Sequence, residues 1–430
     1  MDRKEILNKT IKMKFAHIAD VHMGGWRDPR MKDLSFKYFD EAINICIQER
    51  VDFLLIAGDL FNTSYPGIDA LKKVAEGLRS LRDKNIRVYA IAGSHDYSPS
   101  GKAMIDVLQN AGLLINVAKG QNNNGELKLE FSEDISGVKI VGIPGRANML
   151  DKKYYEQLHR PELENTEGYK IFLFHTALEE LKPKNMEKME AQPVSLLPRN
   201  FDYYAGGHVH IVANKEIDGY RNIVYPGPLF PNSFSELEHL KKGGMFIVDA
   251  TVDVVDANNV ESSPGIAKTN TMTLAMTNAK TTARRIEIEI KKIITIKKFF
   301  EIASAEDIKN ALSDEIKKHD FNDAVVLIRV HALLKTGRIS DIRFQEIIEE
   351  IYSKGAYFVM KNCKIESQEY QSIKVEAQTP EQIEEKFISE NPEPEKVRKF
   401  ITLLNQVKQE GETNSDFDER ISEEIIEETY

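Results

Sequence analysis

The segment RVYAIAGSHDYSPSG, residues 87–101, begins with an apolar run and then breaks at Gly93-Ser94-His95-Asp96. An apolar run that ends in glycine and polar residues is typical of a buried strand followed by a sharp turn. Polar side chains on a loop after a buried strand are a common way to hold functional groups on a rigid scaffold. We therefore expect a functional site at this turn, built together with other loops of the same kind.

Apolar strands alternate with helix-like stretches on both sides of this segment, over residues 13–250. This alternation predicts a layered α/β fold in which helices cover a central sheet. Strands are expected at residues 14–19, 51–57, 86–92, 138–142, 170–175, 201–206, 220–225 and 244–250, and helices at residues 33–50, 66–84 and 102–111.

The second half of the chain changes character twice. Residues 251–282 are rich in Asn, Thr, Ser and Ala with little periodicity, which predicts a linker or long loop. Strand and helix patterns resume over residues 283–373 and predict a small second α/β domain. Residues 374–430 form an acidic tail that we expect to be helical, and residues 1–12 form a polar extension. Within the second domain we expect strands at 283–290, 324–332 and 356–363 and helices at 305–318 and 340–353.

Composition excludes several classes of protein. The chain has 430 residues, 41% hydrophobic and 29% charged, which indicates an ordinary globular protein of two or three domains. No apolar run approaches the roughly 20 residues of a membrane helix, and the charged first residues predict no signal peptide. Cys46 and Cys363 lie far apart in no ligand-like spacing, so we expect a reducing compartment and a cytoplasmic protein.

The net charge of −10 is uneven. Most of it belongs to residues 380–430, whereas the rest of the chain is close to neutral. The body of the protein therefore has room for a local basic face that binds a polyanion.

Carboxylates and imidazoles follow successive predicted strands. In an open α/β sheet, side chains beyond the carboxyl ends of the strands meet in one crevice. Clustered carboxylates and imidazoles are typical of a divalent metal site, and a carboxylate can bridge two ions. Two such ions about 3.5–4 Å apart can activate a water and clamp a phosphoryl oxygen. Each motif alone is commonplace, but the ordered set predicts this chemistry; its members are Asp20, His22, Asp59, His95, His175, His208 and His210.

The ordered motifs DVH, GD, GSHD, H and GHVH resemble those of the calcineurin-like metallophosphoesterase superfamily, over roughly residues 14–213. Within it, FAHIADVHMGG, AGDLF and YPGPLFPNSFSE resemble the nuclease subunit of the DNA double-strand-break repair complex (the MRN type, SbcD-like in bacteria). The second domain and the apolar helices of the tail extend this resemblance over most of the chain.

The resemblance implies a role for each site residue. One metal ion would be held by Asp20, His22, Asp59 and His210, and the other by Asp59, Ser94, His175 and His208. His95 would face the scissile phosphate as proton donor or charge stabiliser, and Asp96 would orient His95. Mn²⁺ is the ion that the family usually carries, although Asp and His ligands by themselves also suit iron, zinc, nickel or magnesium.

Two residues depart from the family pattern. Ser94 stands where the family has Asn, so a shorter hydroxyl replaces an amide oxygen on a longer arm. Either Ser94 reaches the metal, or a water fills the gap, or the second metal binds weakly. Asn62 stands where this nuclease subfamily usually has a His that is thought to assist exonuclease action.

Two further surfaces are expected. A group of cations opens the second domain, and the resemblance implies DNA binding through its phosphates; a solvated edge strand with protective lysines explains the same pattern equally well. These cations are Arg284, Arg285, Lys291, Lys292, Lys297 and Lys298.

The tail carries two apolar stripes at helical spacing. They either pack on their own domain or dock onto a partner as a helix in a groove. We favour docking, and the resemblance implies that the partner is an SMC-like coiled-coil ABC ATPase. The stripe residues are Val397, Phe400, Ile401 and Leu404, followed by Phe417, Ile421 and Ile425.

The sequence therefore predicts a two-metal-dependent DNA nuclease, a homodimer that processes double-strand ends together with the ATPase. Two alternatives remain open at this point. One is a DNA-end-binding scaffold whose nuclease is weakened, as Ser94 and Asn62 suggest. The other is a small-nucleotide phosphodiesterase, which seldom needs a capping domain and a partner-binding tail.

Overall fold

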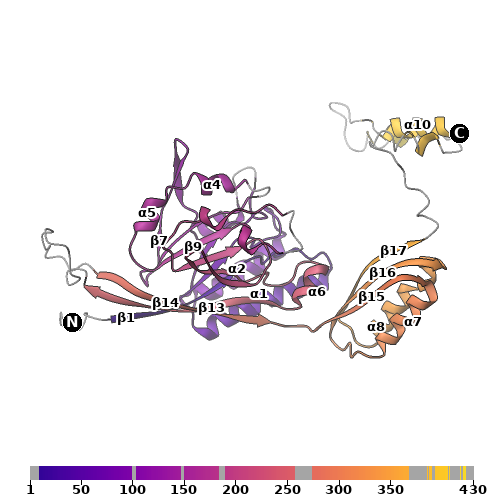
Figure 1. Ribbon diagram of the computed structural model, residues 1–430, viewed down its shortest axis with the longest axis horizontal. Coiled ribbons are helices and arrows are strands. Elements are labelled where there is room, and N and C mark those ends of the chain that lie inside the picture. Colours follow the sequence, from indigo (N-terminus) through magenta and orange to yellow (C-terminus); the bar gives the residue numbers. More distant parts are fainter. Residues whose placement is uncertain are drawn as a thin grey trace. The chain divides into compact units, whose positions relative to one another are not determined.

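The structure is a computed structural model, drawn in Figure 1. It describes residues 9–98, 103–146, 150–183, 189–256, 274–367 and 393–404, with short pieces at 385, 387–389, 406, 417 and 420–422. The chain divides into two compact units. The first comprises Met1–Phe299, Lys309–Val330 and Arg343–Cys363, and the second comprises Phe300–Ile308, His331–Ile342 and Lys364–Tyr430.

Two six-stranded sheets form the centre of the first unit. The first sheet consists, in spatial order, of β14 (Leu274–Ile288), β13 (Gly243–Asp256), β1 (Lys9–Ile18), β2 (Phe53–Ala57), β3 (Arg87–Ile91) and β4 (Ile115–Asn116). The second consists of β11 (Ala213–Ile217), β12 (Tyr220–Tyr225), β10 (Tyr203–Gly207), β9 (Lys170–His175), β8 (Lys139–Ile143) and β7 (Ser132–Glu133). A separate hairpin joins β5 (Gly120–Asn123) to β6 (Glu126–Leu129).

The two sheets pack face to face, so the prediction of a single central sheet is wrong, although the layered α/β class is confirmed. Alternate residues of β1 explain the arrangement, because side chains of a strand point to opposite faces in turn. Phe15 lies in the core shared with the second sheet, where its ring stacks on Phe53 at 5.0 Å. Ala16 and Ile18 lie in the other core, beneath the helices.

Helices cover the outer faces of both sheets. Packed on the first sheet are α1 (Pro29–Glu49), α2 (Ile68–Arg82) and α3 (Met104–Asn110), and packed on the second are α4 (Lys152–Glu156) and α5 (Arg160–Asn165). The short helix α6 (Phe234–Leu240) follows β12 along the chain, and single 3-10 turns occur at Glu179–Leu181, Val194–Leu196 and Ile339–Ile342.

Local signals set the bounds of α1. Asp28 accepts a hydrogen bond from the backbone N–H of Arg30 and so caps the first turn, and Pro29 follows at the position where a missing N–H costs nothing. The helix ends where Arg50 takes a left-handed conformation with φ of 54°.

Parallel pairing brings the ends of the central strands to one edge. His17 of β1 pairs with Leu55 of β2, which pairs with Tyr89 of β3. In the second sheet, His175 at the end of β9 pairs with Gly207 at the end of β10. The loops that follow these strands therefore meet at the same edge of the two-sheet core.

The expected linker over residues 251–282 is wrong where the structure describes it. Residues 251–256 extend β13 and residues 274–282 belong to β14, and these two strands pair antiparallel from Gly243↔Ile288 to Asp256↔Leu274. Residues 257–273 lie outside the described ranges. The pairing also moves a domain boundary, because residues 283–288 complete the first sheet instead of opening the second domain. At the other end, β1 begins at Lys9, inside the expected polar extension.

The second α/β region has a three-stranded sheet with two helices. Its strands are β15 (Ile293–Ser304), β16 (Val325–Thr336) and β17 (Phe358–Ser367), in that order, and its helices are α7 (Ala305–Ile316) and α8 (Phe344–Ser353). The expected strands and helices after residue 300 are all present with shifted ends, whereas β15 was missed because lysines and exposed aromatic residues interrupt its alternation. In the tail the structure describes α10 (Pro394–Leu404).

Among the described residues, no helix combines the length and the apolar character that crossing a membrane requires.

A buried histidine gives the fold a pH dependence. His17 has no exposed surface and shares a hydrogen bond of 3.0 Å with the Tyr203 hydroxyl, and burial lowers its pKa to about 3. Below its usual pKa of 6.5, the unfolded chain takes up a proton that the folded chain does not. Stability therefore falls as pH drops below 6.5, by about 2 kcal/mol at pH 5, and His17 contributes nothing to the slope above pH 7.

Guanidinium unfolding of the metal-free protein at pH 7.5 and pH 5 tests this expectation. His17→Phe loses the contact with Tyr203 but also loses the proton uptake, so the stability difference between wild type and variant should shrink by about 2 kcal/mol at pH 5. A difference that stays the same at both pH values would contradict the assignment.

Candidate metal centre

The predicted metal ligands come together at the carboxyl ends of the central strands. Asp20 and His22 follow β1, Asp59 follows β2, and His175 ends β9. His208 and His210 lie in the loop after β10. Their carboxylate oxygens and ring nitrogens form groups whose ligand atoms lie within 4.8 Å of one another: Asp20, His22 and His210; Asp59, His175 and His208; and His22, Asp59 and His95.

The backbone under these ligands takes conformations that side chains usually avoid. The φ angle is positive at five of the seven ligand positions, with values of 51° at Asp20, 47° at His22, 51° at Asp59, 98° at His208 and 52° at His210. Such strain persists only where the surroundings hold it in place, and it is concentrated at functional sites.

Hydrogen bonds between loops supply that support. The backbone carbonyl of Asp59 accepts from the N–H groups of Val21 at 2.9 Å and His22 at 3.0 Å, so the loops after β1 and β2 interlock. The Asp20 carboxylate accepts the N–H of His208 at 2.9 and 3.1 Å and thereby ties the first sheet to the second. The ligands are held before any ion binds.

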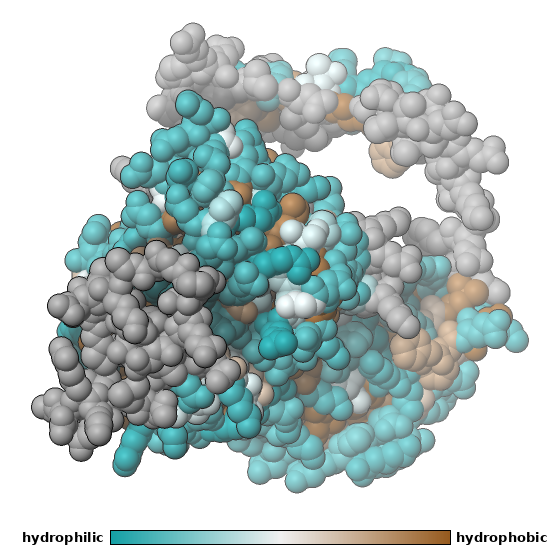
Figure 2. Space-filling view, turned by 60° about the vertical axis from the view of Figure 1, so that its left-hand side comes forward, coloured by the Kyte–Doolittle hydropathy of each residue, from teal (hydrophilic) through white to brown (hydrophobic). Residues whose placement is uncertain are grey.

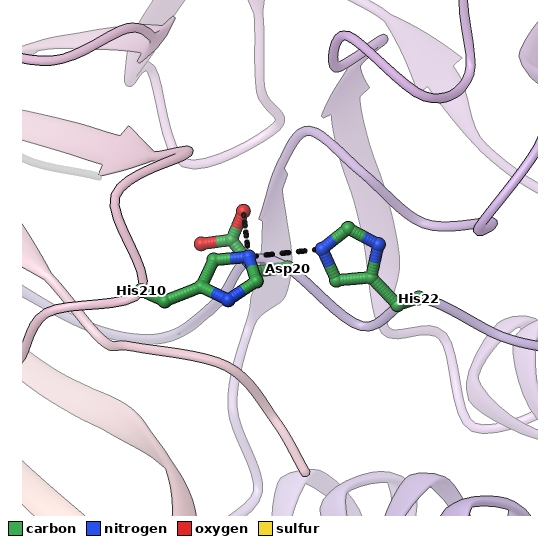
Figure 3. A group of neighbouring side chains, drawn as sticks. All are labelled: Asp20, His22 and His210. Atoms are coloured by element: carbon green, nitrogen blue, oxygen red, sulfur yellow. Dashed lines mark hydrogen bonds and ion pairs between the residues drawn. The ribbon is translucent and has the colours of Figure 1, made fainter. Parts of the chain in front are cut away.

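Asp20, His22 and His210 make up the first cluster, shown in Figure 3. The Nε2 atoms of His22 and His210 lie 2.9 Å apart, and His210 Nε2 lies 3.7 Å from Asp20 Oδ1. The three side chains point toward one another from two different loops. This cluster directs two imidazole nitrogens and a carboxylate oxygen toward one position. Such a set of donor atoms suits a divalent transition metal.

Asp59, His175 and His208 make up the second cluster. His175 Nε2 lies 3.1 Å from Asp59 Oδ2, and the rings of His175 and His208 are 5.1 Å apart between centroids. The Nδ1–H of His175 donates to the Ala57 carbonyl at 2.8 Å, so its other nitrogen is left to coordinate. A second hydrogen bond that orients the ring is typical of metal-binding histidines.

One oxygen of Asp59 serves both clusters. Oδ2 lies 3.1 Å from His175 Nε2 and 3.7 Å from His22 Nε2, whereas Oδ1 accepts the backbone N–H of His95 at 2.8 Å. The expected bridging role thus falls on a single oxygen, because the other one holds the loop after β3. Both clusters fit divalent ions on these donors, and Asp59 is the ligand that they share.

Two glycines leave room for His175. A Cβ atom at Gly58 would lie 2.2 Å from His175 Nδ1, and φ is +86° there. A Cβ atom at Gly145 would lie 2.5 Å from Cδ2 of the same ring. These positions hold glycine because the backbone approaches the imidazole closely.

The four histidines of the two clusters differ in pKa, according to whether the Asp20 or Asp59 carboxylate outweighs the effect of burial. Burial lowers the pKa of His22 to about 3 and that of His208 to about 4, so both rings are neutral. Burial also disfavours charge on His175 and His210, but the carboxylates of Asp59 and Asp20, respectively, outweigh it and raise their pKa values to about 10 and about 9. A metal ion must displace the protons of these last two, so metal binding at neutral pH releases protons.

His95 is exposed and stands over the site. Its Nδ1–H donates to the Asn62 carbonyl at 2.8 Å, which leaves Nε2 without that constraint, and its ring centroid is 4.9 Å from that of His22. A group bound between the two clusters would therefore lie within reach of His95 Nε2.

The expectation that Asp96 orients His95 is wrong. Asp96 is 1% exposed, and its carboxylate accepts the backbone N–H groups of Leu60 at 3.1 Å, Phe61 at 2.9 Å and Gly93 at 3.0 Å. It points into the protein and joins the loops after β2 and β3. Burial and the neighbouring Asp59 charge raise the pKa of Asp96 to about 6.

The two departures from the family pattern both lie at the site. Ser94 is partly buried and lines the same groove as Asp59 and His208. The Asn62 side chain is engaged outside the two clusters, because its Oδ1 accepts Asn232 Nδ2 at 3.2 Å.

Sequence reasoning missed Glu236. Its Oε1 accepts the Nδ1–H of His210 at 3.1 Å, so it orients a ligand of the first cluster. A signal was present: Ser233 and Glu236 form the pattern of a capping box at the start of α6, and Ser233 Oγ accepts the Glu236 N–H at 3.2 Å. Because the pattern explains the helix start, it did not draw attention to the metal site.

A groove of 510 Å³ opens beside the clusters. Its volume is in the range of ligand-binding clefts. Polar lining comes from Asp59, Ser94, His95, His208, His210, Ser235, Glu236 and His239, and apolar lining from Pro183, Met189, Val209, Ile211 and Leu240.

Most cations predicted to bind DNA are balanced by a nearby acid. Lys291 pairs with Asp323, Lys298 with Glu315 at 2.8 Å, Arg284 with Glu49 at 2.7 Å, and Arg285 with Glu287 at 3.0 Å. Within the described ranges, no ion pair joins Lys292 to another residue. The face seen in Figure 2 is largely hydrophilic, with hydrophobic residues in small separate patches.

Lys297, whose side chain is 44% exposed, lies beside an ion pair built on a buried carboxylate. Its Nζ lies 3.2 Å from Glu238, which is 6% exposed and which accepts Arg329 Nε at 2.9 and 3.0 Å. This cluster attaches α6 to β16, so Lys297 has a structural role. A buried carboxylate needs such partners, because an unpaired charge there is strongly destabilising.

The tail is described only in part. Val397 and Ile401 are partly buried residues of α10, and the backbone of Phe400 and Leu404 belongs to the same helix. Phe417 and Ile421 fall in short described pieces, whereas Ile425 and residues 371–384 lie outside the described residues.

Comparisons with known proteins agree with this geometry. Residues 13–212 match the family model for calcineurin-like phosphoesterases, which includes every predicted metal ligand. The DNA double-strand break repair protein Mre11 of Archaeoglobus fulgidus is 27% identical over 360 residues, 79% of this chain and 75% of that protein.

The Mre11 of Methanococcus maripaludis is 33% identical over 263 residues, 58% of this chain and 66% of that protein. The Mre11 of Methanopyrus kandleri is 28% identical over 253 residues, which are 55% of this chain and 54% of that protein. The chain thus spans between about half and three quarters of the length of these relatives. Together with the two clusters, these matches show a calcineurin-like phosphoesterase domain over residues 13–212, a metal-dependent phosphodiesterase, in a chain that is similar to Mre11 proteins.

Proposed function

We propose that this protein is a two-metal-dependent DNA nuclease that processes double-strand ends for repair. The observation that carries the proposal is the shared oxygen of Asp59, which faces His22 in one cluster and His175 in the other. Two divalent ions on these residues would supply Lewis-acid chemistry for a phosphodiester. DNA as the substrate is supported by the relatives, which are named DNA double-strand break repair proteins.

Different residues would bind the metal ions and transfer the proton. Asp20, His22 and His210 would hold the first ion, and His175 and His208 the second, with Asp59 between them. His95 would deliver a proton to the leaving oxygen from Nε2, because its Nδ1 is engaged by the Asn62 carbonyl. Asp96 would hold the backbone that follows Asp59, through the N–H groups of Leu60 and Phe61.

We propose Mn²⁺ as the physiological ion. Two or three imidazoles with carboxylates suit several first-row metals, and their relative affinities follow a general order in which Mn²⁺ binds weakly. Selection of Mn²⁺ therefore rests on availability and on the number of oxygen ligands, to which Ser94 could add a hydroxyl.

We propose as partners an SMC-like coiled-coil ABC ATPase, bound by the apolar stripe of α10, and a second copy of this chain. The ATPase proposal rests on the apolar spacing of Val397, Ile401 and Leu404 on one helix. A protein of this kind would act in the cytoplasm on the nucleoid. DNA binding by Lys292, Lys297 and their neighbours remains part of the proposal.

One observation keeps a second function in view. Ser94 offers a shorter and neutral ligand, so the second ion would bind more weakly than with Asn, and the protein would then serve as a DNA-end scaffold. Ser94→Asn is expected to tighten the weaker Mn²⁺ site by at least about tenfold, the lower end of the effect that groups supporting a metal ligand have on affinity.

Cleavage of linear duplex DNA by wild type and Ser94→Asn, over a range of Mn²⁺ concentrations, tests both functions. The nuclease proposal predicts that both proteins cut and that Ser94→Asn reaches half-maximal rate at a lower Mn²⁺ concentration. Cleavage by Ser94→Asn alone would favour the scaffold, and no cleavage by either protein with two ions bound would contradict the nuclease.

A further inference from the structure

A continuous line of hydrogen bonds joins the exposed His95 to the metal ligand His210. The Nδ1–H of His95 donates to the Asn62 carbonyl at 2.8 Å, and the Asn62 side-chain oxygen accepts Asn232 Nδ2 at 3.2 Å. The backbone N–H of Asn232 donates to Glu236 Oε2 at 2.8 Å, and Glu236 Oε1 accepts the Nδ1–H of His210 at 3.1 Å. Both imidazoles are thus held through Nδ1, and both present Nε2 to the site.

The middle of this line is packed against the loop after β1. The Asn232 side chain lies so close to Gly25 that a Cβ atom there would be 2.2 Å from Asn232 Oδ1. Trp26 Nε1 donates to the Pro231 carbonyl at 3.2 Å and holds the same segment. The segment before α6 therefore has little freedom. It contacts Asn62 through the Asn232 side chain, and it is linked to His210 through the Asn232 backbone N–H and the Glu236 carboxylate.

We propose that Asn62, Asn232 and Glu236 form a positioning relay, which makes the orientation of His210 depend on that of His95 and the reverse. The relay needs both amides: Asn62 supplies the acceptor and Asn232 the donor, and a side chain without an oxygen at position 62 breaks it. Asn62 is then a positioning residue that acts on the first cluster without touching it. The proposal rests on the metal site assigned above, yet it can be tested in the metal-free protein.

The competing explanation is that Glu236 is simply the third residue of a helix with a capping box. Ser233 Oγ donates to Glu236 Oε1 at 3.2 Å, so the box exists independently of His210. In that case Asn62 and Glu236 act independently, and a change at one has no effect that depends on the other.

Two measurements separate these explanations, applied to wild type, Asn62→Ala, Glu236→Gln and the double variant. The first is the Kd for Mn²⁺ at each site, from calorimetry. The second is the ¹H–¹⁵N spectrum of histidine Nδ1–H groups in the metal-free, histidine-labelled protein. Asn122→Ala is the matched control, because the Asn122 Oδ1 on the β5–β6 hairpin likewise accepts one hydrogen bond of 3.2 Å, from the Gly125 N–H, while its Nδ2 donates to Gln157 at 3.2 Å.

The relay predicts that Glu236→Gln weakens one Mn²⁺ site by about 10–100-fold, the usual effect of removing a partner of a ligating histidine. It predicts a smaller loss for Asn62→Ala, about 3–10-fold on the same scale, and no further loss when Asn62→Ala is added to Glu236→Gln. It also predicts that Glu236→Gln shifts the His95 Nδ1–H signal, although Glu236 does not contact His95. Asn122→Ala should leave both readouts unchanged.

Losses that multiply in the double variant, together with an unmoved His95 signal in Glu236→Gln, would overturn the relay. This failure is distinct from failure of the proposed function, which would appear as wild-type protein that binds no Mn²⁺. If Glu236→Gln does not fold, Asn62→Ala still decides, because the relay requires it to shift the His210 signal and the competing explanation does not.

Discussion

Replacement of His95 by Gln is expected to lower the rate of phosphodiester cleavage by about 10²–10⁴-fold, the range that a general acid contributes. Gln keeps a hydrogen-bonding group but has no proton to transfer at neutral pH. His95 is exposed and is held through Nδ1, so its loss removes a group from the substrate side of the site. Mn²⁺ should still bind with wild-type stoichiometry, because the two clusters keep all of their own donors.

The Mn²⁺ stoichiometry of His95→Gln tests whether His95 is itself a metal ligand. Its ring nitrogen lies within 4.8 Å of ligand atoms of His22 and Asp59, so it is itself close enough to bind an ion. Single-turnover cleavage and Mn²⁺ stoichiometry of the same preparation distinguish the two roles, since loss of an ion in His95→Gln would make His95 a ligand. His239→Gln is the matched control, because His239 is an exposed histidine in the same groove with Nδ1 bound to the Ser235 carbonyl.

Replacement of Asp59 by Asn is expected to weaken both Mn²⁺ sites together, each by at least about 100-fold, the upper end of the effect that supporting groups alone produce. The Asn oxygen would accept the His95 N–H, as Oδ1 does now, and would leave an uncharged amide nitrogen toward His22 and His175. Among the described residues, Asp59 is the acid whose carboxylate lies against a ring nitrogen of each cluster.

Calorimetric titration with Mn²⁺ checks this result. Asp52→Asn is the control, because Asp52 precedes the same strand and its carboxylate accepts the backbone N–H of Lys14. A variant that lost one ion and kept the other at wild-type affinity would show that Asp59 belongs to a single cluster.

The positions of the candidate ligands could be predicted from sequence because each lies at the end of a strand or in the loop that follows it. The strand Lys170–His175 has the predicted bounds, and His175 is its last residue, so its place in space follows from the parallel sheet. The same reasoning applies to Asp20 and Asp59, since strand ends of a parallel sheet share one edge. The local sequence pattern was sufficient to place a candidate ligand where the position of a strand end fixes the position of that residue.

The supporting residues could not be predicted in this way. Asp96 follows His95 in sequence, but its carboxylate contacts the backbone of a different loop, at Leu60 and Phe61. Glu236 of α6 meets His210 of the loop after β10, and only the folded chain brings them together. Adjacency in sequence says nothing about contacts of this kind.

The β13–β14 hairpin was missed for a different reason. Residues 274–282 combine Thr, Asn and Ala with few large apolar side chains, so their pattern shows no buried face. Pairing along the whole length of β13 stabilises the strand through its backbone, which a side-chain pattern does not report.

The most direct test of the account is the electron paramagnetic resonance spectrum of the protein titrated with Mn²⁺. A carboxylate oxygen shared by two ions couples their electron spins, so the account predicts two ions per chain and a coupled-pair spectrum that disappears in Asp59→Asn. One ion per chain, or two ions with separate and uncoupled signals, would contradict a two-metal centre built on Asp59.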